Sequence, residues 1–152
     1  DHPSLYSTMN PLLTHLPTLI SELQEDRVYN KAVIGFDQAF LDAQIQKIPS
    51  EIRESFEVIK SRDMLLEFMP KGVTKAYGLS LLVRDLGLKQ TEVMSIGDEE
   101  NDLSMIEYAG MGVAMGNAVA QVKAVADIVT ATNEEDGVAK VVETYILQEG
   151  SD

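Results

Sequence analysis

The chain has 152 residues, 45% of them hydrophobic, with a formal net charge of −13 and no cysteine. Such acidity, without any basic stripe, argues against a nucleic-acid partner, because nothing would displace the counterions of a phosphate backbone. No apolar run approaches the ~20 residues of a transmembrane helix, and residues 1–20 lack the basic start of a secretory signal. We therefore expect a cytoplasmic protein without a membrane partner, and the absence of disulfides suits that compartment.

The first seventy residues carry few chemically distinctive side chains and predict short helices and strands. In chain order, the expected elements are a short helix at 4–15, a strand at 31–36, a helical stretch at 37–56 interrupted at Pro49–Ser50, and strands at 56–59 and 65–69 joined by a turn at 61–63. Pro70 and Gly72 then mark a linker, which predicts a domain boundary.

An amphipathic helix follows this linker. Thr74 is its expected N-cap and Gly87 its expected end. Its apolar face comprises Leu79, Leu82, Val83 and Leu86. Lys75 falls in the first turn, where a cation opposes the helix dipole, so its charge is unfavourable unless it serves a purpose. The alternative is an ordinary solvated lysine on the surface.

Oxygen-bearing side chains follow the next predicted strand at once. The apolar run at 93–96 breaks at Gly97 and leads into the segment Asp98-Glu99-Glu100-Asn101-Asp102, after which a second helical pattern begins. Ligands in open α/β sheets bind at the carboxyl ends of strands, and carboxylates there suit Mg²⁺. Alternatively, Asp98 merely caps the helix and its neighbours solvate the first turn.

Strand, polar turn and helix start recur twice more along the chain. The first recurrence covers residues 112–118 and includes Asn117, and the second runs from the strand at 126–130 into the turn and helix start at 133–138. This alternation over residues 75–148 predicts an α/β fold with a parallel, doubly wound sheet.

Four motifs in one order carry a family resemblance. They are Lys75, Gly-Asp-x-x-Asn-Asp at 97–102, Ala-Met-Gly-Asn-Ala at 114–118 and Asn-x-Glu-Asp-Gly-Val at 133–138. Together they resemble the C-terminal part of a haloacid dehalogenase (HAD) superfamily phosphatase of the Cof type, and within it the YidA-like members. The resemblance covers nearly the whole chain and is weakest over the first thirty residues.

The resemblance implies pieces of two domains. Residues 1–70 would be part of the α+β cap that selects substrate, and residues 71–152 the C-terminal half of a Rossmann-like catalytic core. Family members begin with a strand ending in Asp-x-Asp-Gly-Thr, whose first aspartate is the nucleophile, and this motif is absent here. We therefore expect a C-terminal portion that needs a missing N-terminal core segment, in cis or from another chain, beside the strand at 92–96.

The resemblance also implies roles for individual residues in Mg²⁺-dependent hydrolysis of phosphate monoesters, chiefly sugar phosphates, through an aspartyl phosphate. Asp98 would bind Mg²⁺ directly, and Asp102 would orient Asp98 or Lys75. Lys75 would pair with the phosphoryl oxygens and Asn101 would help to place the substrate phosphate. Asn117 would support the same loops, with a simple helix N-cap as its alternative.

Two other readings of the whole chain compete with the phosphatase. One is a non-catalytic chain that keeps the fold and serves as a binding or regulatory module. The other is an unrelated flavodoxin-like or nucleotide-binding domain, which is disfavoured because no G-x-G-x-x-G follows a strand and no G-x-x-x-x-G-K-[ST] occurs. Under the phosphatase reading, this chain alone is expected to be inactive because the nucleophile is missing.

Overall fold

The structure is a computed structural model that describes residues 4–16 and 18–147. The chain divides into two compact units, with the division between Gly72 and Val73. The linker expected from Pro70 and Gly72 therefore lies at the division, which falls two residues beyond the boundary expected at residue 70.

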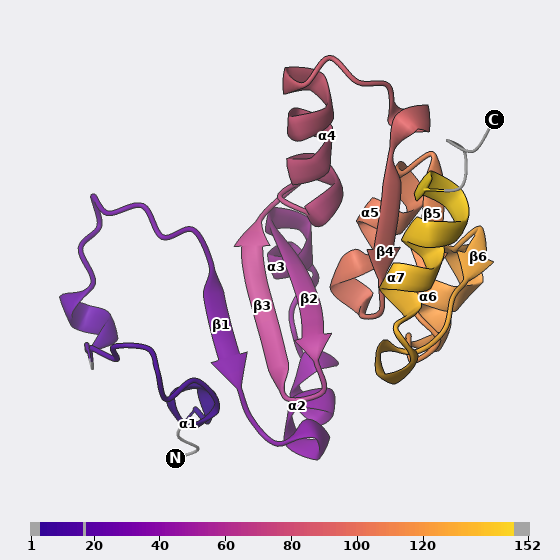
Figure 1. Cartoon of the computed structure of the whole chain (residues 1–152). Helices are drawn as coiled ribbons and strands as arrows, with labels where there is room; N and C mark the ends of the chain where they lie inside the picture. The colour runs from indigo at the N-terminus through magenta and orange to yellow at the C-terminus, as the bar shows by residue number, and fades with distance from the viewer. Residues whose placement is uncertain (1–3, 17, 148–152) are drawn as a thin grey trace. The chain divides into compact units, whose positions relative to one another are not determined.

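The first unit contains an antiparallel sheet in which β3 lies between β1 and β2 (Figure 1). Its strands are β1 (Ala32–Gly35), β2 (Phe56–Arg62) and β3 (Leu65–Pro70). The strand expected at 56–59 thus runs on to Arg62, which shortens the turn before β3. Lys60 on β2 binds Asp42 across 2.6 Å and so ties the sheet to a helix.

The helices of this unit are α1 (Tyr6–Met9), α2 (Gln38–Ile45) and α3 (Ser50–Ser55). Asp37 caps α2, since its Oδ1 accepts the N–H of Phe40 at 3.0 Å. Pro49 is the N-cap of α3, which confirms the interruption expected there. The helix expected at 4–15 is a single turn, because Pro11 disfavours the helical conformation at Asn10.

The second unit contains a parallel sheet in the order β4-β5-β6, as the alternating pattern predicted (Figure 1). Its strands are β4 (Met94–Gly97), β5 (Met111–Ala114) and β6 (Ile128–Val129). The helices are α4 (Lys75–Asp85), α5 (Leu103–Tyr108), α6 (Ala120–Val125) and α7 (Gly137–Val142), with a π-helical turn at Glu143–Leu147. Within the described residues β4 pairs only with β5, so it forms one edge of this sheet.

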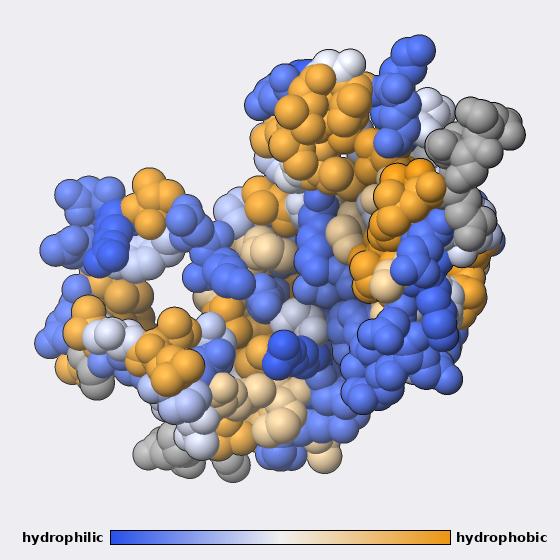
Figure 2. All heavy atoms as spheres, in the orientation of Figure 1, coloured by the Kyte–Doolittle hydropathy of each residue, from blue (hydrophilic) through white to orange (hydrophobic). Residues whose placement is uncertain are grey.

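Helix α4 begins and ends where the sequence predicted. Thr74 Oγ1 accepts the N–H of Tyr77 at 3.2 Å, and Gly87 adopts a φ of +66° beyond the other end. Its apolar face is less buried than expected: Val83 is buried, but Leu82 and Leu86 are 54% and 62% exposed. Figure 2 shows this apolar surface over α4. None of the helices in the described ranges is long and apolar enough to cross a membrane.

The apolar core of the second unit lies against the strands and fixes the ends that carry the polar segments. It comprises Ile106, Ala114, Met115, Ala118 and Val122. Burial of such side chains contributes roughly 1.5–3 kcal/mol for each large one. The ladder continues past the strand ends, since Met115 N–H donates to the carbonyl of Gly97 at 2.9 Å and Gly116 N–H to that of Ala131 at 3.0 Å. The three strand ends are therefore held in register.

Candidate functional site

The candidate site lies at the carboxyl ends of the three parallel strands of the second unit. Asp98 directly follows β4, Asn117 follows β5 and Asn133 follows β6. Parallel strands end at the same edge of a sheet, so these residues come from distant parts of the chain to one place.

Asp102 is the best-connected residue of the site. It is only 4% exposed, and its Oδ1 forms an ion pair with the ammonium of Lys75. Its Oδ2 accepts the backbone N–H groups of Asp98, at 2.9 Å, and Glu99, at 3.1 Å. One carboxylate thus binds both the turn that carries Asp98 and the charged end of Lys75.

The pKa of Asp102 reflects opposing influences. Burial alone would raise it, but the hydrogen bond from Lys75 and those from the N–H groups of Asp98 and Glu99 outweigh burial. The pKa of Asp102 is therefore held below its ordinary value. The carboxylate stays ionised near neutral pH and keeps Lys75 in place.

A glycine is required at position 97 because the side chain of Asp102 lies directly against it. A Cβ at position 97 would lie 2.5 Å from Cβ and 2.8 Å from Cγ of Asp102, which is closer than atoms approach without displacement. The absence of a side chain at Gly97 lets the carboxylate reach the N–H groups of the next two residues. This explains why a glycine precedes Asp98 in the motif.

Asp98 is not a helix cap. The N-cap position of α5 belongs to Asp102, whereas Asp98 Oδ2 accepts Nδ2 of Asn117 at 3.1 Å. The carbonyl of Asp98 accepts the N–H of Val119 at 2.9 Å. Asn117 is likewise not a cap, because Val119 holds that position before α6. Both capping alternatives from the sequence are therefore wrong.

Lys75 and Asn101 lie closer to solvent. The Lys75 side chain is 47% exposed although its ammonium is paired with Asp102. The same turn of α4 is tied to α5, since the N–H of Ala76 donates to Ser104 Oγ at 3.3 Å. Asn101 lies in the 3₁₀ turn Glu100–Asp102, and its side chain makes no hydrogen bond within the described part of the chain.

Asn133 was not among the residues expected in the site. Its backbone N–H donates to Oδ1 of Asn117 at 3.0 Å. The motif that contains Asn133 was noticed in the sequence, but a backbone donor leaves no side-chain pattern to find. Ser104 was missed for a similar reason, since a lone hydroxyl on a short helix has many possible partners.

The residues present fit part of a Mg²⁺ site. Mg²⁺ typically takes one or two protein carboxylates and completes its shell with water or phosphate oxygens. Asp98 offers one such carboxylate at a strand end, steadied by Asn117. Across residues 4–16 and 18–147, no group of three or more His, Cys, Asp and Glu side chains could hold a metal by itself. Water or phosphate oxygens would complete the shell.

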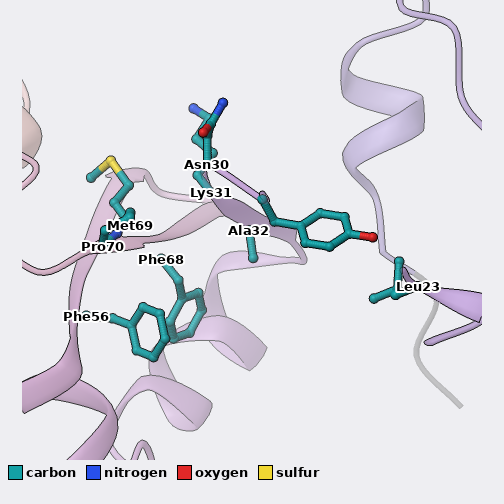
Figure 3. A pocket seen from close by; sticks show the side chains of 9 residues that line it. Leu23, Asn30, Lys31, Ala32, Phe56, Phe68, Met69 and Pro70 are labelled. Carbon is teal, nitrogen blue, oxygen red and sulfur yellow. The ribbon is translucent and has the colours of Figure 1, made fainter. Parts of the chain in front are cut away.

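A separate pocket in the first unit has a different character (Figure 3). It has a volume of about 310 Å³ and is lined by Leu23, Tyr29, Asn30, Lys31, Ala32, Phe56, Phe68, Met69 and Pro70. No carboxylate lines it, and the ammonium of Lys31 is paired with Glu67 at 2.9 Å. Its apolar and aromatic lining offers nothing that would bind a metal.

Acid is expected to remove the stability that Asp102 contributes. The pKa of Asp102 is lowered in the folded chain, relative to about 3.9 in the unfolded chain. The stabilisation by the Asp102 carboxylate is therefore fully present above the unfolded pKa and is lost as pH falls through the folded pKa. We expect the difference in unfolding free energy between the parent and Asp102→Asn to be constant from about pH 7 to about pH 5 and to shrink below about pH 4. Urea titrations measure it, and a constant difference down to about pH 2 would contradict the lowered pKa.

A match to a family model identifies the family of this chain. A family model described as haloacid dehalogenase-like hydrolase matches residues 6–142. The 5-amino-6-(5-phospho-D-ribitylamino)uracil phosphatase YcsE of Bacillus subtilis (strain 168) is 40% identical over 115 residues, which are 74% of this chain and 46% of that protein.

Solved structures give the same result. A haloacid dehalogenase-like hydrolase from B. subtilis superposes with a TM-score of 0.71 at 33% identity, over 84% of this chain and 45% of that one. The HAD subclass IIB sugar phosphatase BT4131 superposes with a TM-score of 0.65 at 33% identity, over 76% of this chain and 43% of that one. The chain thus spans less than half the length of each of these three relatives.

Proposed function

Since this chain belongs to the haloacid dehalogenase-like hydrolase family, we propose that it supplies the C-terminal half of a Mg²⁺-dependent phosphatase that hydrolyses phosphate monoesters. The family and the α/β fold agree with the fold class expected from the sequence. The nucleophilic aspartate would come from a core segment outside these 152 residues, in cis or from another chain, and would carry the phosphoryl group as an aspartyl phosphate.

One observation carries this proposal: Asp102 joins Lys75 to the turn that carries Asp98. The cation of Lys75 and the turn that carries the Asp98 carboxylate are thereby held at one edge of the sheet. Phosphoryl transfer needs positioned positive charge around the equatorial oxygens, together with a place for a metal ion. A purely structural ion pair would not require the same carboxylate, that of Asp102, to bind the turn that carries Asp98.

The roles proposed for the side chains follow from their positions. Asp98 would hold Mg²⁺, which when bound neutralises charge on the phosphoryl oxygens. Lys75 would contact the substrate phosphate while Asp102 keeps its ammonium in place. Asn101, whose amide is not engaged by the described residues, would donate to the phosphate. Asn117 would support Asp98.

We propose sugar phosphates or related polyol phosphates as the substrate class. Support comes from two similar proteins, a sugar phosphatase and a phosphatase of a phosphoribitylamino uracil, both of which act on phosphates of carbon chains bearing hydroxyls. Residues 1–72 form a unit separate from the candidate site, which suits a cap that selects the substrate.

The purified 152-residue chain is expected to hydrolyse neither p-nitrophenyl phosphate nor hexose phosphates in the presence of Mg²⁺, because it lacks the nucleophile. A protein in which a strand ending in Asp-x-Asp-Gly-Thr precedes this chain is expected to hydrolyse them. A colorimetric phosphate assay on both proteins makes the comparison, with EDTA as the metal-free control.

Each outcome of that comparison decides between functions. Turnover by the chain alone, copurifying phosphatase having been excluded, would show that the nucleophile lies within it and overturn the proposed mechanism. A longer protein that binds phosphate esters but turns none over would favour the non-catalytic binding module instead.

A further inference from the structure

Two consecutive hydrogen bonds link the loops that follow the three strands. The N–H of Asn133, after β6, donates to Oδ1 of Asn117 at 3.0 Å. Nδ2 of Asn117, after β5, donates to Oδ2 of Asp98, after β4, at 3.1 Å. The side chain of Asn117 therefore spans the gap between the carboxylate of Asp98 and a backbone group of another loop.

The chemistry of these groups allows the Asn117 amide only one orientation. A backbone N–H can only donate, so the amide oxygen must face Asn133. An ionised carboxylate can only accept, so the amide NH₂ must face Asp98. If the amide were turned over, it would set donor against donor on one side and acceptor against acceptor on the other. Asn117 is thus held from both ends.

The loop that holds Asn117 is itself firmly fixed. Thr132 donates from its hydroxyl and its N–H to the carboxylate of Glu135, at 2.9 and 3.2 Å. Thr130 Oγ1 donates to the carbonyl of Gly137 at 2.8 Å, and the N–H of Gly137 returns to the carbonyl of Thr132 at 3.0 Å. These hydrogen bonds hold the turn that begins at Asn133 against the residues that follow β6.

The Asp98 carboxylate has less support of its own. Its backbone is fixed at the carbonyl by Val119 and at the N–H by Asp102, whereas its carboxylate accepts a hydrogen bond from the amide of Asn117. Without that bond, the Asp98 side chain could rotate about its torsions, and the carboxylate would no longer be held in one orientation. A metal would then have to order the side chain on binding, at a cost in conformational entropy.

We propose that Asn117 is a positioning residue that holds the Asp98 carboxylate in the orientation that binds Mg²⁺. The backbone N–H of Asn133 fixes the amide of Asn117 in turn. This rests on the proposed function only in assigning Mg²⁺ to Asp98. Groups that orient metal ligands typically change metal affinity by about 10–100-fold when they are removed. We expect an effect of that size on Mg²⁺ affinity.

The first test follows Mg²⁺ titration of the ¹⁵N-labelled 152-residue chain by NMR. The side-chain NH₂ signals of Asn117, identified by their loss in Asn117→Ala, are expected to shift together with the backbone amides of Asp98 and Glu99 and with one dissociation constant. Such shifts would show that the hydrogen bond from Asn117 to Asp98 is kept when the metal binds. NH₂ signals that stay still while the Asp98 amide shifts would overturn the proposal.

The second test removes each end of the link. Asn117→Ala is expected to weaken Mg²⁺ binding by about 10-fold or more. Asn133→Pro deletes the N–H that holds Asn117 and also the side-chain amide, which donates to Glu134 Oε1 at 3.2 Å. The backbone can accept proline here, because position 133 begins a 3₁₀ turn and Thr132 already has the extended backbone that precedes proline. Asn133→Ala, which keeps the N–H, is the comparison: Asn133→Pro should bind Mg²⁺ more weakly than Asn133→Ala. Gln121→Ala, on the exposed face of α6, is the control expected to bind like the parent.

Asp98→Ala separates this proposal from the one on which it rests. If Asp98→Ala leaves Mg²⁺ binding unchanged, the assignment of Mg²⁺ to Asp98 fails. If it removes binding while Asn117→Ala and Asn133→Pro bind as tightly as the parent, the positioning role alone fails. The dispersion of the amide signals in each spectrum shows whether the variant is folded. If Asn117→Ala and Asn133→Pro both unfold, the Asn117 NH₂ shifts of the parent chain remain as the test of the positioning role.

Discussion

Replacing Asp98 with alanine is expected to lower the phosphatase activity of a longer protein that contains this chain by about 10²–10³-fold or more, measured as kcat/KM with Mg²⁺ present. The change removes the carboxylate that we propose to hold the metal and leaves Asn117 without its acceptor. Lys75→Ala should produce a loss of the same order, because it removes the cation that we propose to contact the phosphate and leaves the buried Asp102 without its ion-pair partner.

Charged neighbours provide matched controls for these two variants. Glu100 is exposed in the same turn as Asp98, and Lys89 is exposed just beyond the end of α4. Glu100→Ala and Lys89→Ala are expected to keep nearly full activity. If Glu100→Ala were as damaging as Asp98→Ala, the activity would depend on the charge of the turn as a whole, which would contradict the specific role of Asp98.

Gly137→Ala is expected to be the most destabilising of the small substitutions in the second unit. A Cβ at position 137 would lie 2.1 Å from the carbonyl oxygen of Ala131 and 3.0 Å from Met115 Cε. That oxygen cannot move aside readily, because it accepts the N–H of Gly116 at 3.0 Å and so belongs to the aligned strand ends. We expect a loss of about 3 kcal/mol, at the upper end of the usual cost of overpacking.

Gly78→Ala is the matched control. Gly78 lies inside α4, and a Cβ there would meet no atom within 4 Å. Alanine restricts the unfolded chain and favours helix, so this variant should gain about 0.5–1 kcal/mol. Urea unfolding of both variants, followed by circular dichroism, measures the difference. Equal stabilities for the two would show that the contact at Gly137 is relieved by a movement of the loop.

The sequence predicted the parallel sheet and the strand ends well, for reasons that are local. The run at 93–96 became β4 with a shift of one residue, and Thr74 and Gly87 delimit α4 as expected. Short apolar runs, a capping hydroxyl and a glycine with positive φ each act on their immediate surroundings. Such features can be interpreted without knowing the rest of the fold.

The partners of the site residues could not be predicted in this way. A capping role for Asn117 was as reasonable as a supporting one, since both need an amide just before a helix. Its actual partners lie 19 residues before it and 16 residues after it, and they meet only because the strands are aligned in register. The burial expected for Leu82 and Leu86 failed for the same reason. An apolar stripe shows which side chains a helix could bury, but not which other element covers them.

The separations between these partners also set an order in which the site can form. Asp102 bonds to residues three and four positions away, so its turn can close as soon as that stretch of chain folds. The link from Asp98 through Asn117 to Asn133 instead closes two long loops, each of which contains a strand and a helix. Contacts between residues far apart in sequence form slowly, since the entropy of loop closure must be overcome before they contribute. During refolding, the carboxylate of Asp98 should therefore find its final orientation only after the sheet is complete, which makes it a late reporter of folding in this half of the chain.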